Sequence, residues 1–116
     1  MKHNLVQEKS YSFAIRILAV ARWLRAKKKF DLGSQVLRAG TGIGSNVEEA
    51  LAAVSRPDFV AKMGIASKEA RETYYWLRLL RDASMVPHPR IQPLVDECLE
   101  LVRILTAIMK TAQGKV

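Results

Sequence analysis

Apolar side chains recur every three or four residues along most of the chain, which is the period of an amphipathic α-helix. Four segments carry this period, near residues 5–27, 34–53, 56–84 and 91–111, and turn-forming residues separate them. No alternating pattern bounded by turn residues indicates a strand. The pattern predicts an all-α fold, an antiparallel up-and-down four-helix bundle formed by one domain over residues 1–116.

The predicted core takes one apolar stripe from each segment. The four stripes are Val6, Phe13, Ile17, Val20 and Leu24; Val36, Gly40, Ile43, Val47, Ala50 and Val54; Phe59, Met63, Ala66, Ala70, Thr73, Leu77 and Leu80; and Leu94, Cys98, Leu101, Leu105 and Ile108. A second stripe in the third segment mixes apolar side chains with carboxylates, namely Ile65, Glu69, Glu72, Trp76 and Leu79. Such a mixture is typical of an interface between subunits, so we expect self-assembly.

Glycines 40, 42 and 44 lie inside the second segment, although each weakens a helix by about 1 kcal/mol relative to alanine. We interpret Gly40 and Gly44 as positions where a neighbouring helix passes close to the backbone. A phosphate-binding glycine loop is the alternative. It is excluded because no strand precedes these glycines and the spacing of the dinucleotide and P-loop motifs is missing.

The chain has a formal net charge of +8, and most of it comes from residues 1–30, where eight basic side chains accompany only Glu8. This asymmetry is typical of proteins that bind a polyanion, while a basic surface that is merely solvated gives the same composition. The residues predicted to contact phosphates are Arg16, Arg22, Arg25, Lys27, Lys28 and Lys29.

Few residues offer catalytic or metal-binding chemistry. A di-metal bundle needs two Glu-x-x-His motifs, and the chain has only two histidines, so we expect no metal and no cofactor. The single cysteine, Cys98, is interpreted as a small core residue. Arg81 and His88 have a spacing that resembles that of some helical-bundle ribonucleases, but His88 stands between two prolines in an expected turn. We therefore favour a protein without enzymatic activity.

Four motifs follow one another in the middle of the chain: Leu32-Gly-Ser-Gln-Val-Leu-Arg-Ala39, Ile43-Gly-Ser-Asn-Val-Glu-Glu49, Ser55-Arg-Pro-Asp-Phe59 and Lys68-Glu-Ala-Arg-Glu-Thr-Tyr-Tyr-Trp-Leu-Arg-Leu-Leu80. In order and spacing, residues 11–86 resemble the bacterial four helix bundle protein family, also called the ribosomal RNA intervening-sequence proteins. The resemblance implies an antiparallel bundle that assembles into a homopentameric ring and has no established enzymatic activity. Distant relatives, the accessory proteins of diversity-generating retroelements, are basic pentamers that bind nucleic acid and a reverse transcriptase.

The polar residues that match the family pattern are Gln35, Arg38, Asn46, Glu49 and Glu72. A buried polar side chain without a hydrogen-bond partner costs about 1–3 kcal/mol. We therefore predict that these residues, with Trp76, form a structural network or an interface rather than a ligand site. The chain departs from the family where many members read Asn-Ile-Ala-Glu-Gly followed by an arginine. Here the segment is Asn46-Val-Glu-Glu-Ala50, and the arginine is absent.

Two functions are compatible with these features. The leading one is a non-enzymatic homo-oligomer that binds nucleic acid, above all RNA, through phosphate contacts of low sequence specificity. The alternative is a protein-binding scaffold or accessory subunit, for example of a reverse transcriptase. Its anchors would be Trp23, Tyr75 and Trp76, unless these are buried between identical subunits. A lone cysteine, no secretory signal and no membrane-spanning run favour the cytoplasm.

Overall fold

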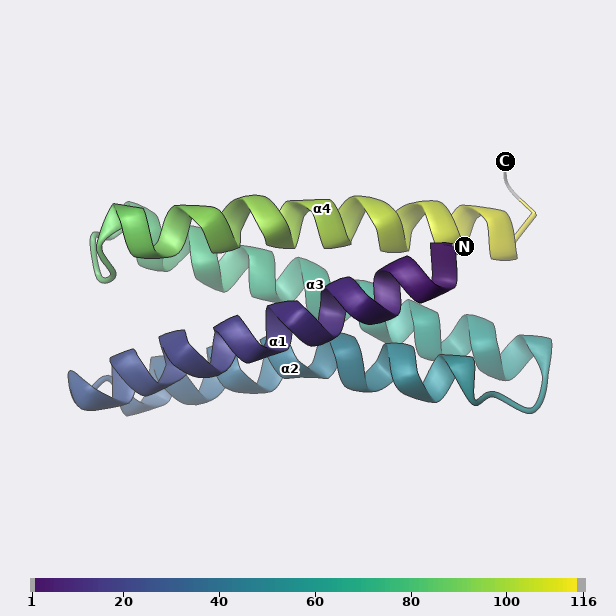
Figure 1. Ribbon diagram of the computed structural model, residues 1–116, viewed down its shortest axis with the longest axis horizontal. Coiled ribbons are helices and arrows are strands. Elements are labelled where there is room, and N and C mark those ends of the chain that lie inside the picture. The colour runs from purple at the N-terminus through teal and green to yellow at the C-terminus, as the bar shows by residue number, and fades with distance from the viewer. Residues whose placement is uncertain (1, 115–116) are drawn as a thin grey trace.

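Four α-helices form the protein in the computed structural model, which describes residues 2–114 (Figure 1). They are α1 (Lys2–Ala26), α2 (Phe30–Leu51), α3 (Arg56–Asp82) and α4 (His88–Ala112). Residues 2–114 contain no strand. α1 packs against α2 and α4, and α3 packs against the same two helices, whereas α1 and α3 do not meet. α1 and α3 therefore occupy opposite corners of the bundle, and the prediction of an all-α, four-helix protein is confirmed.

The bundle measures 43 × 23 × 20 Å, and each helix runs along its length. A helix of 25 residues is about 38 Å long, so one helix spans nearly the whole molecule. The turns at 27–29 and 83–87 lie at one end, and the turn at 52–55 lies at the other (Figure 1). The end that carries the turns at 27–29 and 83–87 is formed by residues 22–30 and 78–90, and we call it the two-turn end.

The core follows the predicted stripes closely. All predicted core residues of α1 and α4 are buried, and in α3 only Phe59 is half-buried. The prediction for Val54 is wrong, because this side chain is 96% exposed. α2 ends at Leu51, so Val54 lies in the following turn, where the helical period no longer applies. Ser10 and Thr73 are the buried polar side chains of the described residues, and each donates its hydroxyl to a backbone carbonyl one turn earlier.

Two glycines of α2 lie against α1. A Cβ added at Gly40 would stand 2.7–3.0 Å from three atoms of the Ile17 side chain, and one added at Gly44 would stand 3.4 Å from the carbonyl oxygen of Ser10. Ile17 is fully buried, so it has no free space to move into. The missing side chains therefore allow the close crossing of α1 and α2 that these glycines predicted.

Both turns at the two-turn end use the same backbone device. In the first, Lys29 N donates to Leu24 O at 2.9 Å and Lys28 N donates to Arg25 O at 2.9 Å. In the second, Met85 N donates to Leu80 O at 2.9 Å and Ser84 N donates to Arg81 O at 3.1 Å. This is the Schellman pattern, which requires a left-handed residue, and Lys28 (φ 64°) and Ser84 (φ 56°) take that conformation where glycine is usual.

The Schellman turns explain why two helices begin earlier than expected. The first reverses the chain within residues 27–29, so α2 begins at Phe30 rather than Ser34. After the second turn α4 begins at His88, three residues before the expected start at Ile91. By contrast, α3 begins as predicted after Ser55, whose hydroxyl accepts a hydrogen bond from Asp58 N at 3.2 Å.

Replacing either left-handed residue with glycine should stabilise the protein. A non-glycine residue in this conformation costs roughly 1 kcal/mol, so Lys28→Gly and Ser84→Gly should each raise the melting temperature by about 4 °C in thermal unfolding followed by circular dichroism. Lys29→Gly is the matched control, because Lys29 has φ −97° and gains nothing from glycine. A melting temperature that falls in both variants would contradict the assigned turn geometry.

Candidate nucleic-acid interface

Five of the six predicted phosphate-contacting residues gather at the two-turn end. Arg22 and Arg25 lie in the last two turns of α1, and Lys27, Lys28 and Lys29 form the turn that follows. All are exposed except Lys29, which is half-buried. None of the five forms an ion pair with an acidic side chain in the part of the chain that the structure describes. Their charge is therefore available to an external anion.

The sixth residue, Arg16, has a different environment. It lies in the middle of α1, where its guanidinium pairs with Glu97 of α4 and Nε donates to Oε2 at 2.9 Å. Lys9 pairs with Glu100 of α4 along the same seam. Two cations of the first thirty residues are thus offset by α4, and among the side chains described from residue 4 to residue 30 the unopposed positive charge lies at the two-turn end.

The fold adds Arg90 to this cationic group. The Lys27 ammonium lies 5.4 Å from the centroid of the Trp23 ring, and the Arg90 guanidinium carbon lies 5.7 Å from it. Both distances are typical of cation–π contacts. Trp23 is half-buried and packs against the core, so one indole contacts two cations, one from the turn at 27–29 and one from α4. Sequence reasoning missed Arg90 because its place depends on which end of α4 meets the end of α1.

Two further arginines of the two-turn end have partners within the chain. Arg81 Nε donates to Asp82 at 2.8 Å and Arg81 Nη1 donates to Gln92 at 3.2 Å. The hydrogen bond with Asp82 raises the pKa of Arg81 and lowers the pKa of Asp82. The guanidinium carbon of Arg78 lies 4.6 Å from the centroid of the Tyr74 ring. Arg81 therefore contributes less unopposed charge than the turn at 27–29, because Asp82 pairs with it.

The arginine–histidine pair of the ribonuclease alternative is not assembled. Arg81 is held by Asp82 and Gln92, and no hydrogen bond joins it to His88. His88 is exposed and is the first residue of α4, rather than part of the turn where the sequence placed it.

Four residues predicted to form a polar network come together between α2 and α3. Arg38 donates to Gln35 at 3.2 Å and contacts the carboxylate of Glu72, and Trp76 Nε1 donates to Glu72 at 3.1 Å. Arg38 also reaches Glu69 at 3.4 Å. Glu72 and Trp76 thus have partners in their own chain, and their predicted place between subunits is not needed to satisfy them.

The other two polar residues of the pattern lie elsewhere on α2. Asn46 donates to the carbonyl oxygen of Gly42 at 2.8 Å, within its own helix. Glu49 pairs with Lys62 of α3 at 3.0 Å, and this hydrogen bond raises the pKa of Lys62. Each forms a separate contact and neither touches the Arg38 group.

The metal-ligating side chains, the single cysteine and the apolar character of the helices bear on other kinds of function. Residues 2–114 contain no group of three or more His, Cys, Asp or Glu side chains able to hold a metal ion. Cys98 is buried and donates to the carbonyl oxygen of Ala70 at 3.4 Å. Burial raises the pKa of its thiol to about 12, so the nucleophilic thiolate is scarce at neutral pH. None of the four helices, over the residues described, is long and apolar enough to cross a membrane.

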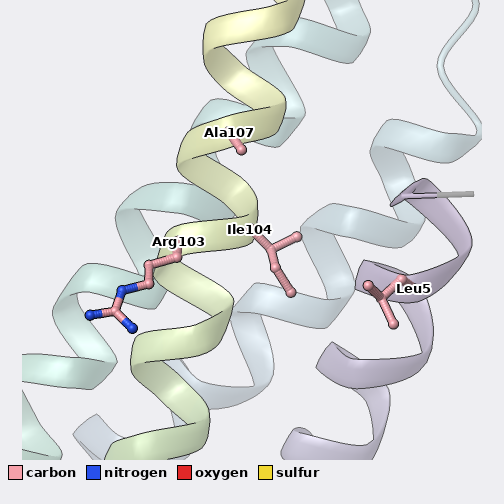
Figure 2. A pocket seen from close by; sticks show the side chains of 4 residues that line it. All are labelled: Leu5, Arg103, Ile104 and Ala107. Carbon is pink, nitrogen blue, oxygen red and sulfur yellow. The ribbon is translucent and has the colours of Figure 1, made fainter.

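One apolar hollow lies far from the two-turn end. It has a volume of about 260 Å³ and is lined by Leu5, Arg103, Ile104 and Ala107. Figure 2 shows Leu5 of α1 and Ile104 of α4 facing each other across it, while the Arg103 guanidinium points away. The described side chains direct no polar group into the hollow, so they form no catalytic arrangement there (Figure 2).

Comparison with known proteins identifies the family. A family model described as 23S rRNA-intervening sequence protein matches residues 2–107. Among solved structures, the chain is similar to a protein of unknown function from the S23 ribosomal protein family of Bacteroides thetaiotaomicron. The two are 40% identical with a TM-score of 0.89, over 95% of this chain and 99% of that one. No curated protein matches. Since the matched residues include α1, α2, α3 and most of α4, the chain belongs to the 23S rRNA-intervening sequence protein family.

Proposed function

We propose that the protein is a non-enzymatic nucleic-acid-binding protein whose ligand, RNA in the first instance, contacts the two-turn end through its phosphates. The observation that carries this proposal is the group of five basic side chains without acidic partners, joined by Arg90 across the Trp23 ring. Each phosphate that a cation neutralises releases counterions, which makes binding favourable and strongly dependent on salt. Exposed lysines contact phosphates without reading bases, so sequence specificity should be low.

Other observations support parts of this proposal. The family description names 23S rRNA intervening sequences, so RNA is the first nucleic acid to test. The inert environment of Cys98 and the occupied guanidinium of Arg81 favour a protein without catalytic activity. The reduced, buried Cys98 also agrees with a cytoplasmic location.

We further propose that the bundle is antiparallel and assembles into a closed homo-oligomeric ring, a pentamer by resemblance to the family. The alternation of turns between the two ends supports the antiparallel order (Figure 1). Exposed apolar residues form two stripes, Tyr11, Ile15 and Leu18 on α1 and Ile65, Tyr75 and Leu79 on α3. A ring needs two different contact surfaces on each subunit, and these stripes lie at opposite corners of the bundle. Repetition of the cationic end around such a ring would multiply weak phosphate contacts.

The alternative function is a protein-binding scaffold, for example an accessory subunit of a reverse transcriptase. Of the predicted anchors, Tyr75 is 50% exposed and its ring makes an edge contact with Trp76. Trp23 and Trp76 are half-buried and are less accessible to a partner. A pull-down with and without nuclease separates the two functions. Partners that remain bound after nuclease treatment favour the scaffold.

Removing the turn lysines should weaken RNA binding and flatten its salt dependence. Replacing Lys27, Lys28 and Lys29 with glutamine should reduce the slope of log affinity against log salt by about 2, since each lost contact with a single strand removes about 0.7. Fluorescence anisotropy of a labelled RNA at several salt concentrations measures this. The matched control replaces Lys68, Arg103 and Lys110, three exposed cations away from this end, and should bind nearly as the parent does. Equal losses in both triple variants, or a parent without salt dependence, would contradict the proposal.

The ring can be tested by breaking one face at a time. Ile15→Glu should abolish the α1 face and Leu79→Glu the α3 face, because each places a charge in an apolar contact. If the contact joins α1 to α3, each variant alone should be monomeric by light scattering, and a mixture of both should form dimers through the two intact faces. Dimers of either variant alone would instead show a symmetric contact and contradict the ring.

A further inference from the structure

An exposed aromatic residue directly follows the turn lysines in the chain. Phe30 is the first residue of α2, directly after Lys29, and 54% of its surface is exposed. It does not belong to the partly buried hydrophobic residues that pack against the core. Phe30 therefore makes little contribution to the stability of the bundle through core packing.

Basic residues of α1 and of the turn at 27–29 flank the start of α2, where Phe30 lies. On α2, Phe30 is a neighbour of Gly33, because residues three apart lie on the same side of a helix. The Cγ atom of Arg25 lies only 3.4 Å from the position of a Cβ on Gly33, so the arginine stem crosses α2 one turn away from Phe30. Lys28 and Lys29 precede the ring in the chain, and Asp31 is the one acidic residue in the first turn of α2. Phe30 thus lies in a predominantly positive environment.

An aromatic ring among cations is the arrangement that binds single-stranded nucleic acid. The cations attract the phosphates, and the ring stacks on a base that is not already stacked in a duplex. We propose, on the basis of the function proposed above, that Phe30 is a base-stacking residue and that the preferred ligand is single-stranded RNA. Trp23 does not serve this purpose, because it is half-buried and Lys27 and Arg90 already lie against its ring.

The positive charge around Phe30 complements nucleic-acid phosphates, so charge as well as apolar exposure favours Phe30 as the stacking residue. The other exposed aromatic residues, Tyr11 and Tyr75, lie in the stripes assigned to subunit contacts, away from the turn lysines. Phe30 lies outside both stripes, at the end of the bundle. A symmetric contact between two copies through Phe30 would bring two sets of turn lysines together, and their repulsion opposes such a contact.

Binding of a labelled 20-nucleotide single-stranded RNA and of an RNA duplex of the same length tests this assignment. Phe30→Ala and Phe30→Leu should weaken single-strand binding about tenfold and leave duplex binding unchanged, whereas Phe30→Trp should retain it. The leucine variant keeps an apolar side chain but lacks a π face, so it isolates stacking. Val54→Ala, which alters an exposed apolar residue at the opposite end of the bundle, is the control and should have no effect.

The outcomes separate this inference from the proposed function. If the parent binds RNA with a steep salt dependence but all Phe30 variants bind as it does, stacking is wrong and phosphate binding stands. If Phe30→Ala changes the mass measured by light scattering, Phe30 is an assembly residue and the inference is wrong. If the parent binds neither RNA, both proposals fail.

Discussion

Burial of one apolar stripe from each helix in a shared core is the constraint on which the rest of the structure depends. In α1, Phe13, Ile17 and Leu24 are fully buried. Because residues three and four apart share a helix face, burying these side chains sets the rotation of α1 and directs Arg22 and Arg25 to solvent. Apolar burial contributes about 25 cal/mol per Å², while an exposed ion pair contributes about 0–1 kcal/mol. The core therefore determines where the charges lie.

The contact between α1 and α4 determines which positive charges of α1 are neutralised. α4 presents Glu100 to Lys9 and Glu97 to Arg16, but at the two-turn end it presents a cation, Arg90, beside Trp23. Among the described side chains of residues 4–30, the positive charge is thus neutralised along the side of the bundle and left unopposed at the two-turn end. Lys28 adopts the left-handed conformation, which glycine would adopt at lower cost. The lysine at this position adds a positive charge to the two-turn end, and glycine would not.

Periodicity predicted the helices and their buried stripes because local spacing alone decides which side chains share a face. It failed at Val54 and at the start of α2, where a turn rather than a stripe determines the structure. The site was predicted less well. Arg16 was predicted to contact phosphates but pairs with Glu97, whereas Arg90 was not predicted and joins the cationic group beside Trp23. Both differences arise because the pairing of α1 with α4 is a tertiary property that no local sequence pattern contains.

Nucleic acid is proposed to contact the two-turn end and not the sides of the bundle. Ultraviolet crosslinking of the protein to single-stranded RNA, followed by mass spectrometry of the crosslinked peptides, tests it most directly. Crosslinks are expected within residues 22–30 and at Arg90, and none in the turn at 52–55 at the opposite end. Crosslinks concentrated in that turn, or on the α1 stripe around Ile15, would contradict it.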